Sequence, residues 1–244
     1  MRGLNTTIFS LVTAAAAVAA VAVAAVASAP AARASAGTPV LRYSFDQGTP
    51  SDESGHGHAL TTYAVRGGAT LAVAHGTGRA LRFPKHCSGR KCPRVVLQTA
   101  STDELNPGTA PFGYGATVLL PKKQTTKGQN VLQKGYSHAG GQYKLQVDGK
   151  AGRPSCVLVG TGRHVIHQAR SATSVADGAW HSIECHRAGA VLTVTVDGTV
   201  RGTTAIPANL SVSNAAPLSI GGKGAYADND QFQGTLDDLW VSRD

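Results

Sequence analysis

The sequence predicts an all-β fold, either a sandwich or a barrel, from three observations. Short apolar stretches alternate with turns after residue 36, and the chain holds 29 glycines in 244 residues. Within the stretches, apolar and polar residues alternate with a period of two, as burial of one sheet face requires. The sequence shows neither a long helical period nor a repeat of about 20–50 residues, which disfavours a propeller.

The clearest strand pair is VLTVTVDGTVRGTTA, residues 191–205. Leu192, Val194 and Val196 share one face, and threonines occupy the other. The Asp-Gly dipeptide that follows stands where a two-residue hairpin turn is expected. Further strands are expected, in chain order, at residues 40–45, 61–65, 80–84, 94–99, 115–121, 130–135, 142–148, 155–160, 164–169, 180–187, 217–222 and 232–242.

The N-terminus is typical of a secretory signal peptide. Arg2 follows the initiator Met, an apolar run rich in Ala and Val covers residues 8–27, and residues 1–36 contain no Asp or Glu. The run ends in small residues, ASAPAARASAG. Because the run is nearly long enough to span a bilayer, an uncleaved membrane anchor is the alternative.

We expect cleavage after Ala36, with cleavage after Ala29 as the alternative. The mature chain is then a single domain, residues 37–244, because no linker divides it. One helical turn is expected at residues 101–108, with Ser101 or Thr102 as its N-terminal cap and Pro107-Gly108 at its end. We expect a secreted, extracellular monomer that has no membrane contact once the signal is removed.

Four cysteines in an exported chain predict two disulfides. The sequence alone allows three pairings. Cys87 and Cys92 bracket the short loop SGRK, and local pairing of these two leaves Cys156 to pair with Cys185 on a neighbouring strand. A disulfide-bonded Cys185 is no nucleophile, although it lies close to His181 in DGAWHSIECHRAG. We expect His181 to form a hydrogen bond at the edge of the core.

The order of several motifs along the chain adds to this pattern. LRYSFDQGTPSDESGHGHAL holds a strand and an Asp-x-Ser-Gly turn, and GRALRFP, LNPGTAPFGYGATVLLP and GQNVLQKG follow it. DGAWHSIECHRAGAVLTVTVDG joins a Trp-His strand to an Asp-Gly hairpin, and PLSIGG and FQGTLDDLWVSRD close the chain. In this order, residues 40–244 resemble the LamG-like, concanavalin A-like jelly-roll family of secreted proteins. The resemblance implies an all-β, two-sheet antiparallel jelly-roll sandwich, in which the two sheets pack face to face.

The sequence lacks the catalytic pattern of glycosidases that share this fold. Those enzymes carry a Glu-x-Asp-x-x-Glu strand, whose carboxylates act as acid and nucleophile. Here Glu53, Glu104 and Glu184 are the only glutamates, and none stands in that arrangement. Neither Gly-x-Ser-x-Gly nor a phosphate loop occurs. We expect no catalytic residue and no enzyme; a glycoside hydrolase or polysaccharide lyase is the least favoured class.

The resemblance implies one structural calcium ion where the first and last strands meet. Carried over, Asp46 and Asp237 supply oxygens, and carbonyls of SGHGH add more, because calcium takes six to eight oxygen ligands. The sequence departs from the family at His56 and His58, where asparagine is expected. Imidazole suits transition metals, so zinc or copper at the two histidines is one alternative, and a polar turn is the other.

Aromatic residues in glycine-rich loops are candidates for stacking on sugar rings. Tyr114, Tyr136 and Tyr226 meet this description and are the predicted ligand-binding residues; the alternative is that they only cover the edge of the sandwich. Trp180, at the start of a strand, is expected to cover one end of the core.

The formal net charge of +9 favours acidic partners. Basic residues gather around the short disulfide loop and in a second loop: Lys85, Arg90, Lys91, Arg94, Lys122, Lys123 and Lys127. Ordinary solvated charge is the alternative, and export together with the lack of an aromatic-basic module argues against nucleic acid. The expected function is non-catalytic binding of carbohydrate or an anionic cell-surface polymer; a protein–protein adhesion module is the alternative.

Overall fold

Two antiparallel sheets form the protein in the computed structural model, which describes residue 3 and residues 37–243. The predicted all-β sandwich is therefore confirmed. The predicted signal segment lies almost wholly outside the described residues. Within the part of the chain that the structure describes, no helix is both long enough and apolar enough to cross a membrane.

The first sheet has eight strands. In chain order its strands are β1 (Thr38–Tyr43), β3 (Leu71–His75), β4 (Gly78–Arg82), β6 (Phe112–Leu119), β11 (Trp180–Ala188), β12 (Val191–Val196), β13 (Thr199–Ala205) and β15 (Thr235–Arg243). Their order across the sheet is β13-β12-β11-β6-β15-β4-β3, and β1 pairs with β15.

The second sheet has seven strands. In chain order they are β2 (Thr61–Val65), β5 (Arg94–Thr99), β7 (Gly128–Tyr136), β8 (Gly140–Asp148), β9 (Arg153–Thr161), β10 (Ile166–Arg170) and β14 (Leu218–Ile220). They are ordered β10-β9-β8-β7-β14-β5-β2.

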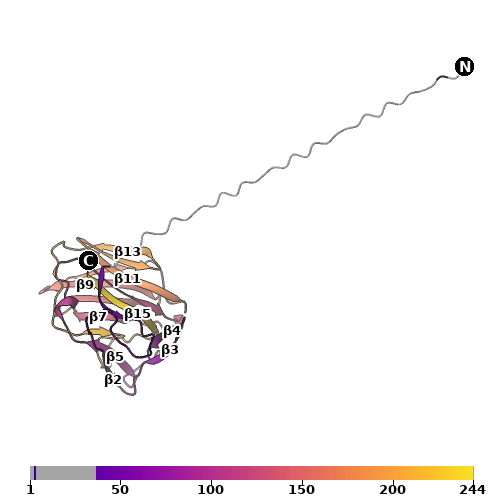
Figure 1. Ribbon diagram of the computed structural model, residues 1–244, viewed down its shortest axis with the longest axis horizontal. Helices are drawn as coiled ribbons and strands as arrows, with labels where there is room; N and C mark the ends of the chain where they lie inside the picture. Colours follow the sequence, from indigo (N-terminus) through magenta and orange to yellow (C-terminus); the bar gives the residue numbers. More distant parts are fainter. Residues whose placement is uncertain (1–2, 4–36, 244) are drawn as a thin grey trace. The chain divides into compact units, whose positions relative to one another are not determined.

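The C-terminal strand β15, yellow in Figure 1, lies in the middle of the first sheet between β6 and β4. It also pairs with the N-terminal strand β1, so the two ends of the domain join one sheet. Neighbours that are distant in sequence are typical of jelly rolls and exclude a simple meander. Long-range pairing of this kind also ties the fold of the first sheet to the complete domain.

The Asp-Gly turn between β12 and β13 is confirmed. Asp197 and Gly198 both have positive φ, 50° and 72°, as a type I′ hairpin turn requires. The predicted helical turn is a short 3-10 turn, η1 (Asp103–Leu105), and Thr102 stands at its N-cap without a side-chain hydrogen bond. A second 3-10 turn, η2 (Lys122–Gln124), and strand β3 were not expected from the sequence.

Apolar side chains from the facing sides of both sheets form one core. Phe112 and Tyr114 of β6 and Tyr143 of β8 are fully buried at its centre, with ring centroids 5.2–5.5 Å apart. Aromatic pairs of this kind add about 0.5–1.5 kcal/mol beyond the area they bury. Their packing joins the first sheet to the second.

Both predicted disulfides are present. Cys87–Cys92 closes the short loop before β5, and Cys156–Cys185 joins β9 to β11 with a Cα–Cα distance of 5.5 Å. The two strands of the second bond belong to opposite sheets. The prediction that they are neighbouring strands is therefore wrong. The bond therefore crosses the core and links the two layers covalently.

We expect Cys185→Ser to lower the free energy of unfolding by about 3–4 kcal/mol, because a bond that closes a long loop restricts the unfolded chain. The variant also places a hydroxyl at a fully buried position. Urea unfolding measures the loss, and a Cys87→Ser/Cys92→Ser variant is the control, with an expected loss of about 2 kcal/mol. Equal losses in the two variants would contradict the role given to the inter-sheet bond.

Candidate functional site

A cleft of about 340 Å³ opens at one end of the first sheet, and we name it the Trp180 cleft. Its apolar lining consists mainly of Val73, Phe83, Leu119, Pro121 and Trp180. Its polar and charged lining consists mainly of Arg82, Lys85, Lys123, Gln124 and Gln233. An apolar wall with a few polar groups at its rim is the usual character of a small-ligand site.

Strand register places the floor of the cleft. Trp180 of β11 is paired with Leu119 of β6, which is paired with Thr235 of β15. Thr235 is in turn paired with Arg82 of β4, so four strands contribute one row of residues. The adjacent residues of β4, β6 and β15 lie in the core. Because side chains alternate along a strand, the row itself points away from the core.

The Trp180 ring is held in place by a stack. The His75 ring lies 3.9 Å from it, centroid to centroid, at an interplanar angle of 22°. His75 Nδ1 is in turn hydrogen-bonded to the buried carboxylate of Asp237, and burial raises the pKa of that carboxyl. Trp180 is only half-buried and lines the cleft, so the prediction that it covers the core is wrong.

Glutamine side chains connect the loops around the cleft. The His86 backbone N–H donates to Gln124 Oε1, and His86 Nδ1 lies 3.0 Å from Gln233 Oε1. Gln129 bridges the same two segments, because its Nε2 donates to the Gln124 carbonyl (2.8 Å) and its Oε1 accepts from the Gln233 N–H (2.8 Å). Hydrogen bonds therefore join three segments: the loop after β4, the turn η2 and the residues just before β15.

The three predicted ligand-binding tyrosines do not lie together. Tyr114 is fully buried, and its Oη donates to the carbonyls of Lys144 and Val157, both at 3.3 Å. A ligand cannot reach it, so this prediction is wrong; its segment is a core strand rather than a loop. Tyr226 is 45% exposed, and Tyr136 is half-buried with its Oη bonded to a backbone carbonyl (2.9 Å).

Tyr136 and Tyr226 lie close enough to form one cluster, since after burial it is the nearby Tyr136 side chain that most raises the pKa of Tyr226. The ring of His138 lies 5.5 Å from that of Tyr136. No lining residue of the Trp180 cleft belongs to this cluster. The tyrosine cluster is therefore a second, separate ligand-binding hypothesis.

The turn that the resemblance assigns to calcium is organised by Asp52. Its carboxylate accepts hydrogen bonds from the backbone N–H groups of Arg42 (3.1 Å), Ser54 (3.0 Å) and His58 (3.0 Å). Burial acts to raise the pKa of Asp52, but these hydrogen bonds outweigh it and lower the pKa below its usual range. Backbone donors thus hold this carboxylate.

The carboxylates expected to bind calcium are also engaged with protein groups. Asp46 accepts from the Arg79 N–H (3.3 Å), and Asp237 accepts from His75 and from the Asp238 N–H. Among residues 37–243, no group of three or more His, Cys, Asp or Glu side chains is placed to hold a metal ion. Calcium at these two residues would require an exchange of hydrogen bonds, and it stays a prediction.

The two histidines of the turn meet Glu104 instead. His56 Nδ1 lies 2.8 Å and His58 Nε2 3.3 Å from the two oxygens of this carboxylate. The contacts connect the turn to η1. This arrangement agrees with the polar-turn alternative and leaves zinc or copper binding as an untested prediction.

Metal removal tests the calcium prediction. If Asp46 and Asp237 bind the ion, EDTA lowers the melting temperature, because an ion at about 100 times its Kd stabilises the fold by about 2.7 kcal/mol. Asp237→Ala should then melt at the same temperature with and without EDTA. A wild-type melt that EDTA does not change would contradict calcium binding, and recovery of an EDTA-lowered melt by zinc alone would favour His56 and His58.

The His-Cys stretch before and within β11 has a structural role. His181 Nδ1 lies 2.7 Å from Asp197 Oδ2, and His181 Nε2 lies 3.1 Å from Asp177 Oδ1. Burial acts to lower the pKa of His181, but the two carboxylates outweigh it and raise the pKa above its usual value. The histidine ties the β12–β13 turn to the segment before β11, as the predicted hydrogen-bonding role requires, while Cys185 is held in its disulfide.

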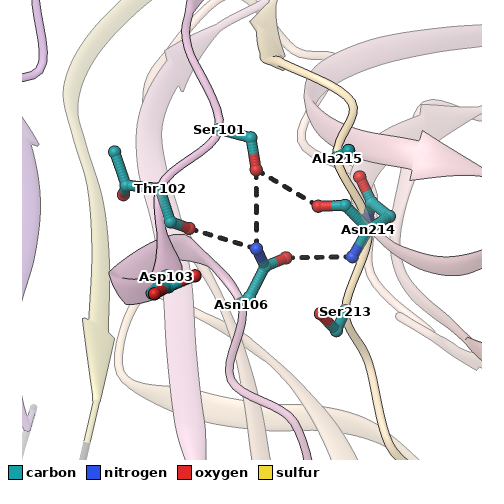
Figure 2. Close-up of a pocket in the computed structure, with 7 residues that line it drawn as sticks. All are labelled: Ser101, Thr102, Asp103, Asn106, Ser213, Asn214 and Ala215. Atoms are coloured by element: carbon teal, nitrogen blue, oxygen red, sulfur yellow. Dashed lines mark hydrogen bonds between the residues drawn. The ribbon is translucent and has the colours of Figure 1, made fainter.

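A second cleft, open and polar, lies between the β5–β6 and β13–β14 connections. Figure 2 shows that its polar groups bond to one another: Asn106 Nδ2 donates to the Thr102 carbonyl (3.1 Å), and the Asn214 N–H donates to Asn106 Oδ1 (3.0 Å). Ser101 Oγ donates to the Asn214 carbonyl (3.1 Å). These bonds use the polar groups that a ligand would need, and none of the lining residues is aromatic.

A buried lysine fastens this junction. Lys134 Nζ donates to Asn106 Oδ1 (3.0 Å), to the Asn214 carbonyl (2.7 Å) and to Asn214 Oδ1 (3.2 Å). The lysine is fully buried, and no carboxylate of the described chain pairs with it. Burial lowers the pKa of Lys134 to about 8.

This lysine makes stability depend on pH in a defined window. The pKa of an unfolded lysine is about 10.4, so between pH ~8 and pH ~10 the unfolded chain binds more protons at this residue than the folded chain does. The contribution of Lys134 to stability therefore rises with pH across that window. We expect the unfolding free energy of wild type to rise relative to that of Lys134→Met from pH 8 to pH 10, as measured in urea titrations. A difference independent of pH would refute the lowered pKa.

Comparison with known proteins supports the fold. The family model of the concanavalin A-like lectin/glucanases superfamily matches residues 100–244. A search of curated protein sequences finds no match. Domain 4 of AbnA, a GH43 extracellular arabinanase from Geobacillus stearothermophilus solved with arabinotriose, is 15% identical with a TM-score of 0.63; the match covers 85% of this chain and 93% of that one.

Toxin binding domains are similar as well. The binding domain of Paraclostridial mosquitocidal protein 1 is 12% identical (TM-score 0.65), and that of botulinum neurotoxin DC in complex with SialylT is 8% identical (TM-score 0.63). Each match covers 84% of this chain but only 49% and 48% of the toxin domains. The chain thus spans about half the length of these domains, and the likeness concerns the fold.

Proposed function

This chain belongs to the concanavalin A-like lectin/glucanases superfamily, and we propose that it is a non-catalytic module that binds carbohydrate in the Trp180 cleft. The observation that carries the proposal is a half-buried tryptophan, fixed by a stacked histidine, in a cleft with a polar rim. Similar folds solved as binding domains, one with arabinotriose, support it.

The geometry suits a sugar ring. Pyranose and furanose rings have C–H faces that pack on an aromatic side chain, and buried apolar area contributes about 25 cal/mol per Å². Val73 and Leu119 extend the apolar surface beside Trp180. Gln124 and Gln233 are largely buried and also line the cleft; their Oε1 atoms are engaged with His86, which leaves their Nε2 groups to donate to sugar hydroxyls.

The absence of catalysis is part of the proposal. Hydrolysis of a glycosidic bond normally uses two carboxylates about 5–10 Å apart on either side of the bond. Among the described residues that line the cleft, none is Asp or Glu. The carboxylate nearest in the stack, Asp237, is buried and bonded to His75. These features support binding without turnover.

The proposal is tested with three aromatic-to-alanine variants on a glycan array and in pull-downs with cell-wall polysaccharide. Trp180→Ala should weaken binding about 30-fold, because truncation of a central aromatic contact costs about 2 kcal/mol. Tyr226→Ala examines the tyrosine cluster, and Tyr63→Ala on β2, 47% exposed, is the control. Loss of binding in Tyr226→Ala alone would move the site to the tyrosine cluster, and no binding to any glycan would refute the proposal.

A protein partner is the second candidate. The binding domain of botulinum neurotoxin DC, 10% identical to this chain, has been solved in complex with rat synaptotagmin II. A binding domain of which about half shares this fold thus engages a protein, which favours this candidate. Pull-downs repeated after enzymatic removal of glycans separate the two candidates: retention that survives deglycosylation favours the protein partner.

We further propose that the N-terminal segment directs export of the chain. The two disulfides support this proposal because such bonds persist in oxidising compartments.

A further inference from the structure

Three exposed cations surround the Trp180 cleft. Arg82 comes from the end of β4, Lys85 from the loop after it, and Lys123 from η2. No acidic residue of the described chain lines the cleft. The charge at its rim is therefore of one sign, beside an apolar wall that screens charge less than water does.

These cations have no counter-ion within residues 37–243. Two cations elsewhere are paired: Arg42 lies 3.7 Å from Glu53 and 3.6 Å from Asp238, and Lys223 lies 2.6 Å from Asp230. None of the three residues of the cleft takes part in such a pair. Like charges around one cleft repel one another, so a bound anion would relieve an unfavourable interaction.

The backbone beneath the cations is fixed. The Phe83 N–H donates to the Gly234 carbonyl (2.9 Å), and the Phe83 ring packs edge-on against Phe232 with centroids 6.0 Å apart. The hydrogen bonds of His86 connect this loop to the turn that carries Lys123 and to the segment before β15. Binding an anion here therefore orders side chains only, and little backbone entropy is lost.

An adjoining cleft has a different character. It holds about 120 Å³ and shares Gln233 with the Trp180 cleft. Arg94 and Lys127 line it, but so do Asp228 and Asp230. Because its charges are mixed, it offers no comparable preference for an anion.

We propose that the Trp180 cleft selects sugars that carry anionic groups, either carboxylate or sulfate. This inference names the ligand class of the carbohydrate-binding function proposed above, and it rests on that function. The tryptophan contacts the C–H face of the ring. Arg82 presents a planar guanidinium that matches the paired oxygens of either group, and Lys85 and Lys123 act as point charges.

Two matched pairs of polymers test the inference: polygalacturonate against its fully methyl-esterified form, and dextran sulfate against dextran. Affinity electrophoresis of the purified chain compares wild type, Trp180→Ala and Lys85→Gln/Lys123→Gln. The control variant, Arg66→Gln/Arg201→Gln, removes two exposed cations that line none of the clefts described here. A single-stranded oligonucleotide is included as a further anionic polymer.

We expect at least one charged polymer to retard the chain and its neutral partner not to retard it. Binding to that polymer should be about tenfold weaker in Lys85→Gln/Lys123→Gln, about 30-fold weaker in Trp180→Ala and unchanged in the control. Retardation should also fall as salt is raised. Equal, Trp180-dependent binding of charged and neutral polymers would overturn the anion preference and leave the carbohydrate function standing. Loss in the control as great as in the lysine variant, or stronger binding of the oligonucleotide, would overturn the inference as well. Retardation by no polymer would overturn the anion preference, and the glycan array then decides the carbohydrate function.

Discussion

Burial of one shared core between two sheets is the constraint on which the rest of the molecule depends. Each strand has an inner and an outer face, and the inner faces of both sheets meet around buried aromatic rings. The Cys156–Cys185 bond crosses this core and holds β9 against β11. Once Cys185 points inward, alternation along β11 directs Trp180 outward. The core therefore determines which side chains can meet a ligand.

The Trp180 cleft is a product of sheet ends and loops. The ends of four strands of the first sheet form one row of residues. Two further segments, the loop after β4 and the turn η2, lie beside that row. A network of glutamine and histidine side chains fixes these loops, and His75 with Asp237 fixes the tryptophan. The strand ends supply an apolar wall and the loops supply positive charge. This division explains how a rigid sandwich can hold a site whose chemistry is set by a few exposed residues.

Period-two patterning, turn residues and cysteine spacing were sufficient to predict the all-β class, the hairpin turn at Asp197 and both disulfides. The choice of a two-sheet sandwich over a barrel rested on the family resemblance. Strand β3 was not predicted, because LAVAH is short and lacks a clear polar face. Tyr114 was misplaced because glycines on both sides suggested a loop. Those glycines instead leave room for a neighbouring ring: a Cβ at Gly115 would lie 2.9 Å from the side chain of Trp240.

The site itself was only partly visible in the sequence. Lys85 and Lys123 were recognised as basic loop residues, but their approach to Trp180 depends on contacts between segments about 40 to 100 residues apart. One signal could have revealed the orientation of the tryptophan: it lies five residues before Cys185, an odd separation that puts the two on opposite faces of the strand. The stack on His75 arises from tertiary packing, which no local pattern specifies.

The location of glycan binding is the central claim, and the chain offers a direct test because it contains only two tryptophans, Trp180 and Trp240. Each gives one indole N–H resonance in a ¹⁵N-correlated NMR spectrum, and Trp180→Phe assigns the pair. Titration with a glycan that the array identifies should shift the Trp180 resonance progressively and leave that of Trp240 in place. A saturating glycan that leaves the Trp180 resonance unmoved would contradict the account.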